Sequence, residues 1–276
     1  MKKYELTNET IKYRGKNLYR IKALIDFGNV KKGTRGGFIE KEENLSVSGN
    51  AFVYGDAKVC DDARVSGNAQ VSGNALVCGC AFVYGAAKVC DDALVCDNAL
   101  VCDNARVYGD AQVSGNAKVC DNAQVSGNAK VCDNAQVRDN AQVCDNARVY
   151  GDAQVSGNAK VCDNAQVSGN ALVCGCALVC GCAFVYGAAK VCDDALVDKS
   201  INYAVINGFG TCCRPTTFFR CQDKTVKVSC GCFLGTIDEF RNQVKNTRGG
   251  KIAKEYLMIA DLMEMHFCEA EDEYDD

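Results

Sequence analysis

Hydrophobic positions in the middle of the chain follow a strict period of six residues. Valine recurs at every sixth position from Val47 to Val197, and alanine stands two residues before each valine from Ala51 to Ala195. Apolar positions that alternate with variable ones predict a short strand with one buried face. Gly-Asn, Asp-Asn and Gly-Asp pairs separate these strands and favour tight corners, because these residues tolerate positive φ.

Strands this short must stack, because a single hexad cannot close a core. Three hexads in each coil, or about 18 residues, predict a triangular prism with valine and alanine inside. A coil of two hexads would need a full reversal of direction at every two-residue corner, so we favour three. The hexads then make roughly eight to nine coils, and stacking at about 4.8 Å per strand predicts a prism about 40 Å long.

The hexad also resembles a known repeat. An aliphatic residue is followed four positions later by a small one, as in Val53 with Ala57 and Val59 with Ala63. This pattern is similar to the hexapeptide repeat of left-handed β-helix proteins and covers residues 45–197. Residues 23–46 resemble the segment that leads into the coils of YdcK-like β-helix proteins. The resemblance implies an all-β solenoid in the form of a left-handed triangular β-helix.

The segments outside the hexads predict two flanking units and a tail. Residues 1–44 are mixed in composition and rather basic, and we expect them to cap the first coil, because an open solenoid end exposes strand edges. The hexads occupy residues 45–198. Residues 199–268 predict a small α+β unit, and residues 269–276 predict a solvated acidic tail.

Within the predicted α+β unit, residues 216–219 and 226–233 indicate two strands. Thr236 and Glu239 have the spacing of a capping box that opens a helix, and residues 252–267 predict a second helix. The apolar face of the second helix is expected to pack on the small sheet. That face is formed by Ile252, Tyr256, Ile259 and Met263.

Composition and charge exclude several classes of function. The resemblance to hexapeptide-repeat acyltransferases implies a histidine base, but the only histidine is His266, in the predicted second helix, so we expect no enzymatic activity. The net charge of −4 gives no reason to expect nucleic acid. No apolar stretch is long enough for a membrane helix, and the N-terminal residues contain no apolar leader. We therefore expect a cytoplasmic protein, in which thiols are kept reduced.

The 21 cysteines are the strongest candidate chemistry, and 15 of them lie in the hexads. Twelve follow the core valine directly, at Cys60, Cys78, Cys90, Cys96, Cys102, Cys120, Cys132, Cys144, Cys162, Cys174, Cys180 and Cys192. Three more occupy the last corner position, in "CGC": Cys80, Cys176 and Cys182. The residue after an inward valine points outward, so we predict that none of the twelve lies in the core. The aspartates that follow many cysteines are interpreted as corner residues.

With three hexads per coil, cysteines that are three hexads apart stack in columns. The predicted groups are Cys60, Cys78 and Cys96 with Cys80; Cys144, Cys162 and Cys180 with Cys182; Cys174 and Cys192 with Cys176; and Cys102 with Cys120. Cys90 and Cys132 have no cysteine neighbour in this register. A coil of two hexads would instead stack Cys78, Cys90 and Cys102, and Cys120, Cys132 and Cys144. The cysteine spacings by themselves leave both registers open.

Groups of four thiols predict metal ligation. Soft thiolates without histidine favour iron–sulfur clusters, and we expect [4Fe–4S] clusters, with zinc as the alternative. A row of such sites suits electron transfer to a redox partner protein, or storage of metal and electrons, and is compatible with an oligomer. The apolar residues beside "CGC" make Cys78 with Cys80, and residues 174–182, the favoured regions. Cys230 and Cys232 are two residues apart in a predicted strand and should share one of its faces. With Cys221 on the partner strand a further small metal site is conceivable, and core cysteines are the alternative.

The competing hypothesis is a non-catalytic scaffold or protein-interaction solenoid with free surface thiols. Residues 102–129 recur identically as residues 144–171. Copying of a "VCDN" unit can therefore have multiplied the cysteines without any selection for metal binding.

Overall fold

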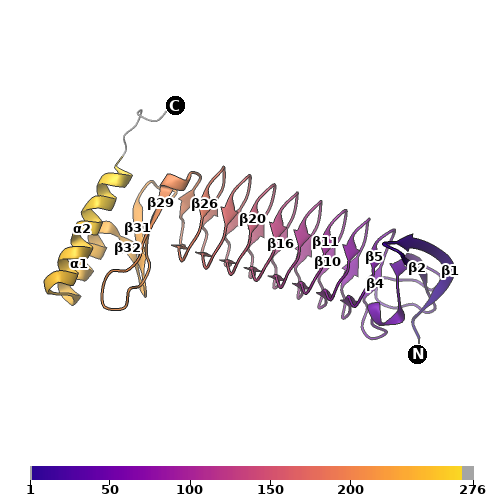
Figure 1. The fold of residues 1–276 in the computed structure, drawn as a ribbon. Coiled ribbons are helices and arrows are strands. Elements are labelled where there is room, and N and C mark those ends of the chain that lie inside the picture. Colours follow the sequence, from indigo (N-terminus) through magenta and orange to yellow (C-terminus); the bar gives the residue numbers. More distant parts are fainter. Residues whose placement is uncertain (1, 269–276) are drawn as a thin grey trace.

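The computed structural model describes residues 2–268, and the acidic tail predicted for residues 269–276 lies outside this part of the chain. Three units follow one another along one long axis (Figure 1): an N-terminal β unit, a prism of stacked coils, and a C-terminal sheet with two helices. Across residues 2–268, no helix combines the length and the apolar character needed to cross a membrane.

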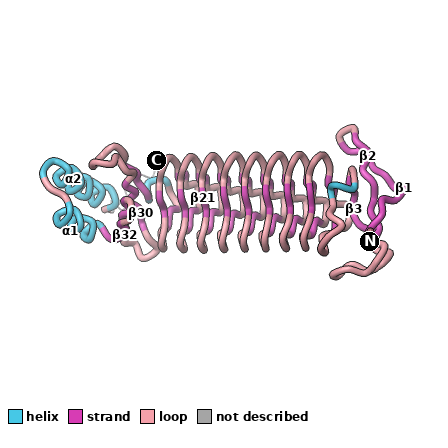
Figure 2. The backbone as a smooth tube through the Cα atoms, turned by 90° about the horizontal axis from the view of Figure 1, so that it is seen from below, coloured by secondary structure: helices cyan, strands magenta, loops and turns pink. Residues whose placement is uncertain are grey.

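The prism consists of two-residue strands arranged as three parallel sheets, which appear as evenly spaced rungs in Figure 2. The first sheet contains β5 (Lys58–Val59), β8 (Leu76–Val77), β11 (Leu94–Val95), β14 (Gln112–Val113), β17 (Lys130–Val131), β20 (Arg148–Val149), β23 (Gln166–Val167) and β26 (Phe184–Val185). The second contains β4 (Phe52–Val53), β7 (Gln70–Val71), β10 (Lys88–Val89), β13 (Arg106–Val107), β16 (Gln124–Val125), β19 (Gln142–Val143), β22 (Lys160–Val161), β25 (Leu178–Val179) and β28 (Leu196–Val197). The third contains β6 (Arg64–Val65), β9 (Phe82–Val83), β12 (Leu100–Val101), β15 (Lys118–Val119), β18 (Gln136–Val137), β21 (Gln154–Val155), β24 (Leu172–Val173) and β27 (Lys190–Val191).

Strand pairing confirms the coil of three hexads. Val59 pairs with Val77 and Val77 pairs with Val95, and the same step separates partners in the other two sheets. A coil of two hexads is therefore excluded. From Ala51 to Val197, each repeat valine and the alanine two residues before it fill the interior and are almost completely buried. Each corner contains one residue in the left-handed region, such as Asp103 at φ 58°, which is why only glycine and aspartate occupy that position.

The first valine of the repeat is an exception to the sequence pattern. Val47 is 54% exposed, while Leu45 is buried and forms a parallel bridge with Val65. Leu45 therefore occupies the inward position, opposite Val65, that the repeat assigns to Val47. Val47 itself lies in a longer corner. The prediction that the valine series fills the core is wrong at this end, because the first coil must accommodate the N-terminal unit.

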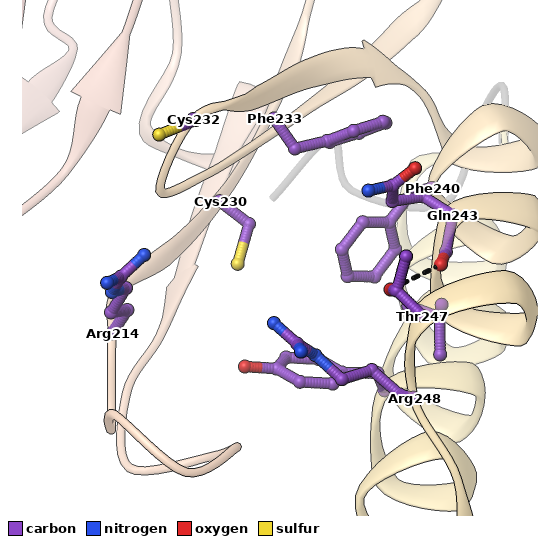
Figure 3. Close-up of a pocket in the computed structure, with 10 residues that line it drawn as sticks. Arg214, Cys230, Cys232, Phe233, Phe240, Gln243, Thr247 and Arg248 are labelled. Carbon is purple, nitrogen blue, oxygen red and sulfur yellow. Dashed lines mark hydrogen bonds between the residues drawn. The ribbon is translucent and has the colours of Figure 1, made fainter.

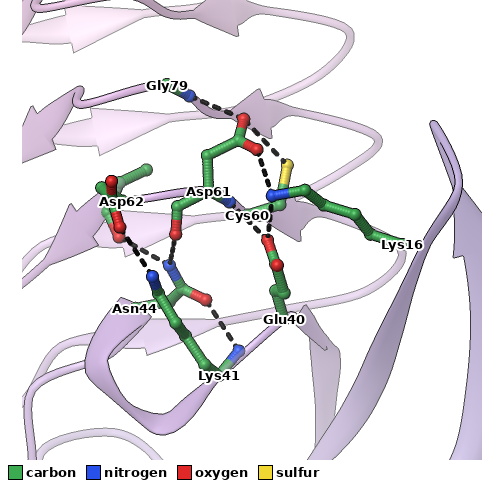
Figure 4. A network of polar contacts seen from close by, with 9 residues as sticks. Lys16, Glu40, Lys41, Asn44, Cys60, Asp61, Asp62 and Gly79 are labelled. Atoms are coloured by element: carbon green, nitrogen blue, oxygen red, sulfur yellow. Dashed lines mark hydrogen bonds and ion pairs between the residues drawn. The ribbon is translucent and has the colours of Figure 1, made fainter.

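The N-terminal unit extends the first sheet and closes its open end. Its elements are β1 (Tyr4–Tyr13), β2 (Lys16–Ala23), β3 (Arg35–Ile39) and the 3₁₀ turn η1 (Glu42–Asn44). β1 and β2 form an antiparallel hairpin, and β3 pairs in parallel with β5. The amide of Asn44 donates to the carbonyl oxygens of Asp61 and Ala63 at 3.1 and 2.8 Å, and the Lys16 ammonium contacts Glu40 and Asp61 at 3.0 and 2.6 Å (Figure 4). The Asn44 contacts satisfy backbone carbonyl groups that an uncapped coil would expose, and the Lys16 ion pairs join the hairpin to the first coil.

The C-terminal unit contains a four-stranded antiparallel sheet and two helices. Its elements are η2 (Ser200–Asn202), β29 (Tyr203–Ile206), β30 (Thr216–Arg220), β31 (Val226–Cys230), β32 (Phe233–Thr236), α1 (Ile237–Thr247) and α2 (Gly250–Phe267). Thr236 and Glu239 form the predicted capping box. Tyr256, Ile259 and Met263 are buried in a cluster with Phe218 of β30 and Phe240 of α1, as predicted.

One predicted strand of this unit is wrong. Residues 226–233 do not form a continuous strand, because Gly231 adopts φ +61° and turns the chain between β31 and β32. The turn separates Cys230 from Cys232, so the prediction that both side chains share one strand face is also wrong. Cys230 is half-buried, whereas Cys232 is exposed.

The C-terminal unit closes the last coil through side chains that replace the missing next strand. The hydroxyl of Tyr203 donates to the carbonyl of Phe184 at 2.7 Å and accepts from the Tyr186 N–H at 3.2 Å. Thr217 Oγ1 accepts from the Lys190 N–H at 2.9 Å. The edge of the prism is therefore paired with polar groups of the cap.

Candidate functional site

The residues that follow the core valines stack into columns on the walls of the prism. Val59, Val77 and Val95 are paired neighbours, so Cys60, Cys78 and Cys96 lie one above another. The same register stacks three further groups, namely Cys144 with Cys162 and Cys180, Cys174 with Cys192, and Cys102 with Cys120. Cys90 and Cys132 have no cysteine above or below them. The structure thus brings together the stacked cysteines expected from the coil of three hexads.

Burial of these thiols differs from the expectation. Five of the twelve are buried, at 2–6% exposure: Cys60, Cys78, Cys102, Cys162 and Cys192. The remaining seven are half-buried, and the three corner cysteines, Cys80, Cys176 and Cys182, are exposed. The prediction that none of the twelve is a core residue is therefore wrong for these five, because other side chains cover the walls.

The two ends of the prism show what covers the thiols. Cys60 and Cys78 pack with Leu18 and Phe38 of the N-terminal unit, in a cluster separate from the interior of the prism. Cys192, in the last coil, belongs to the main hydrophobic cluster, which also contains Phe219 of the C-terminal sheet. Outward direction and exposure are therefore different properties here, since each cap buries the nearest part of a column.

A carboxylate accompanies most wall cysteines. In most "VCD" corners the thiol contacts the next aspartate, and the Sγ–Oδ2 distance is 3.2 Å in both Cys102–Asp103 and Cys144–Asp145. Burial and the Asp145 carboxylate raise the pKa of Cys144 to about 12. Burial and the Asp163 carboxylate raise the pKa of Cys162 to about 11. In the absence of a cation these thiols stay protonated at neutral pH, because a nearby negative charge and a dry environment both oppose the thiolate.

Thiols that stack directly can share protons. The S–H groups of Cys60 and Cys96 hydrogen-bond to Cys78, which lowers the pKa of Cys78 and raises those of its two neighbours. The same contact with Cys192 lowers the pKa of Cys174 to about 7. A thiolate in a column is therefore stabilised by neighbouring S–H donors.

One group has the spacing of a metal site. A ligand atom from each of Cys144, Asp145 and Cys162 lies within 4.8 Å of the other two. Within residues 2–268, this is the one group of three His, Cys, Asp or Glu side chains whose ligand atoms are that close together. Cys180 and Cys182, predicted to complete a four-thiol site, do not join it. Asp145 was interpreted from sequence as a corner residue only. Other aspartates, such as Asp103 and Asp163, also follow a stacked cysteine, so no signal in the sequence singles out Asp145.

The predicted small site in the C-terminal unit is not assembled in the same way. Cys221 is buried at a bridge to Ala195, and Cys230 accepts a hydrogen bond from Thr216 Oγ1 at 3.2 Å. Cys232 is exposed beyond the Gly231 turn. These three thiols do not form a ligand group with the spacing found at Cys144.

Among the comparisons with known proteins, a family profile agrees with the β-solenoid fold. No curated protein matches the chain. A solved structure from Bacillus cereus, provisionally described as an acetyltransferase, matches 65% of this chain and 92% of its own length at 11% identity and a TM-score of 0.24. A similarity this weak carries no argument about activity. The sequence profile of the YdcK β-solenoid repeat matches residues 99–115 and 141–157. Two segments of the prism therefore match the YdcK β-solenoid repeat that the hexads resemble.

Proposed function

We propose that this solenoid is a non-catalytic metal-binding protein, and that its best-formed site is Cys144, Asp145 and Cys162. The observation that carries the proposal is that three potential ligand atoms from two adjacent coils lie within 4.8 Å of one another. The single histidine, His266, is exposed on α2, outside the solenoid. No histidine base therefore accompanies these thiols.

Zinc fits this donor set best. It accepts mixed sulfur and oxygen ligands, and two sulfurs at Zn–S bonds of about 2.3 Å lie about 3.8 Å apart in a tetrahedral site. The two thiols are attached to β19 and β22, which are paired in register through Val143 and Val161. A rigid paired backbone holds both sulfurs on one side of the ion and leaves the outer side for a water molecule or a donor from a partner.

Metal binding at this site must be linked to pH. The pKa values of about 12 for Cys144 and about 11 for Cys162 mean that both thiols lose a proton when they become ligands. Release of two protons strengthens binding by up to about a hundredfold for each unit of pH increase below these values. A cation between the thiols also offsets the Asp145 charge, which otherwise opposes the thiolates.

An iron–sulfur cluster is the second candidate, and the column of Cys144, Cys162 and Cys180 favours it. Such a cluster is held by four thiolates arranged around it. Thiols of one column lie along a single wall, at the strand spacing of about 4.8 Å. A wall therefore contacts one side of a cluster, and the remaining ligands have to come from corner thiols or from a second copy of the chain. Electron transfer or electron storage with a redox partner protein belongs to this candidate.

The experiment measures Zn²⁺ bound by the purified chain in equilibrium dialysis and compares two variants. Cys162→Ser removes a ligand, whereas Cys132→Ser removes a thiol that is also followed by aspartate but has no stacked cysteine. We expect Cys162→Ser to bind one Zn²⁺ fewer than the parent chain, and Cys132→Ser to bind the same number. Binding of the parent chain should weaken steeply from pH 8 to pH 6.

The same preparations separate the other functions. An anaerobic sample reconstituted with iron and sulfide that develops visible absorption, lost in Cys162→Ser but not in Cys132→Ser, would establish the cluster instead of zinc. Equal and negligible metal content in all three proteins would overturn both metal proposals. That result would leave the solenoid as a scaffold with protonated surface thiols.

A further inference from the structure

The C-terminal unit contains a pocket that the metal proposal does not use. Its volume is about 200 Å³, and it lies between the turn joining β31 to β32 and the facing ends of α1 and α2 (Figure 3). The lining residues come from the sheet side, the helix side and the loop before β30. None of them is an aspartate or a glutamate.

One wall of the pocket is apolar and firmly packed. Phe240 packs edge-on against Tyr256, with ring centroids 5.7 Å apart and planes at 90°, and Phe233 lies 5.6 Å from Phe240. The Tyr256 hydroxyl donates to the carbonyl oxygen of Phe209 at 3.2 Å, which fixes the ring. These three rings form a rigid surface against which a flat apolar group can lie.

Two arginines complete the pocket. Arg214 belongs to the loop before β30, and Arg248 is the residue that ends α1. Figure 3 shows them reaching the pocket from different sides of Cys230. Neither guanidinium forms an ion pair with a carboxylate of residues 2–268. By contrast, Arg241 on the same helix contacts three carboxylates, those of Asp238, Asp261 and Glu264.

The position of two arginines beside an aromatic wall gives the pocket its chemical preference. Both arginines are exposed and have no acidic partner within residues 2–268, a property that they share with arginines of the prism such as Arg64 and Arg106. A guanidinium is always charged and offers a planar set of donors that matches a carboxylate. Two of them beside aromatic rings provide a charged edge and an apolar face.

We infer that this pocket binds a small aromatic carboxylate, with the carboxylate between Arg214 and Arg248 and the ring against Phe240 and Tyr256. The polar side chain of Gln243 lies at the same rim. A phosphate ion has the charge but no apolar part, and it would leave the aromatic wall uncovered. The site is independent of the cysteine columns and does not depend on the metal proposal.

The test is a titration of the full chain with benzoate, benzyl alcohol and inorganic phosphate at low ionic strength, followed by two-dimensional NMR and calorimetry. We expect benzoate to bind and to shift the resonances of Phe240 and Tyr256. Benzyl alcohol, which keeps the ring without the charge, should bind at least tenfold more weakly. Phosphate binding as tight as that of benzoate would overturn the assignment to an aromatic carboxylate.

Variants locate the binding site. Arg248→Gln and Arg214→Gln should each weaken benzoate binding at least tenfold. Lys245→Gln removes a positive charge from α1 but does not line the pocket, and it should leave binding unchanged. Arg248→Lys keeps the charge without the planar fork and should lie between the parent chain and Arg248→Gln, which keeps the test valid if the glutamine variant folds poorly. Equal losses in Lys245→Gln and Arg248→Gln would overturn the proposal, because they would indicate a general effect of charge.

Discussion

The solenoid walls and the C-terminal unit use polar side chains in opposite ways. On the walls, side chains contact copies of themselves one coil away. The amide of Asn104 donates to Asn122, and that of Asn122 donates to Asn140, at 3.3 and 3.2 Å. In the C-terminal unit, contacts join different residue types, as between Arg241 and its three carboxylates.

This difference explains where recognition of a ligand can arise. A ladder of identical residues satisfies its own hydrogen bonds and repeats the same surface along the prism. An irregular sheet and helix pair can bring different residue types together around a pocket, as with the guanidinium groups of Arg214 and Arg248 beside Phe240 and Tyr256. The walls are therefore suited to repeated thiol sites, and the C-terminal unit to a single pocket of mixed chemistry.

The largest difference between the two regions is expected when a charge is placed inside the prism. Val131 is completely buried, whereas Met258 on α2 is 71% exposed. Val131→Asp should prevent stable folding of the coils, because an unpaired buried carboxylate costs several kcal/mol even after relaxation, as an order of magnitude. Met258→Asp should change the melting temperature little. Circular dichroism on heating measures both, and similar melting of the two variants would contradict this account.

Thiol reactivity should separate the two regions at neutral pH. Burial first, and then the Asp103 carboxylate, raise the pKa of Cys102 to about 12, although a hydrogen bond from Tyr84 acts in the opposite direction. Compared with an ordinary thiol pKa of about 8.5, the thiolate fraction falls on the order of a thousandfold. Iodoacetamide should therefore label the exposed Cys212 and Cys232 far faster than Cys102. Mass spectrometry of timed samples measures the ratio, and equal rates would show that the wall thiols are not protected.

The junction of the two regions should show a moderate effect. Tyr203→Phe leaves the carbonyl of Phe184 and the N–H of Tyr186 without the hydroxyl that now bonds both. We expect a loss of about 1–3 kcal/mol in the free energy of unfolding of the last coils. Hydrogen exchange of those amides reports the loss locally. Unchanged protection would mean that the C-terminal unit is not needed to close the prism.

The smallest effect is expected within a ladder. Asn122→Ala removes two exposed amide contacts in the middle of the prism. Because solvent can replace them, the free energy of unfolding should fall by no more than about 0.5 kcal/mol. Denaturant unfolding measures the change. A loss comparable to that of Tyr203→Phe would show that the ladders act as cooperative networks.

Much of the fold was predictable because the same pattern of inward and corner residues recurs in every hexad. Alternating Ala and Val specify an inward face, and Gly or Asp at the corner accepts positive φ, so the stacked coil follows from local rules. The register of three hexads per coil was favoured by corner geometry, but the cysteine spacings could not settle it. At Leu45 and Val47 the local pattern failed, because the N-terminal unit fixes the course of the first coil.

The candidate sites were predictable only in part. The columns followed from the repeat, including the stacking of Cys144 and Cys162. The approach of Asp145 to two stacked thiols was missed, because the same residue also forms the corner, and its distance to a thiol in the next coil is not a local property. The arginine pocket was missed as well. Arg214 and Arg248 are far apart in the sequence and carry no motif.

The repeat, the inward residues and the outward direction of the wall cysteines follow from the amino-acid sequence alone. They depend only on contacts within one hexad and between identical coils. Tertiary structure decided which thiols are buried, which ligand atoms approach one another, and which arginines of residues 2–268 face a pocket instead of a carboxylate. Those properties depend on the surfaces that the two caps cover and on the distances between different elements. A periodic pattern carries no information about either.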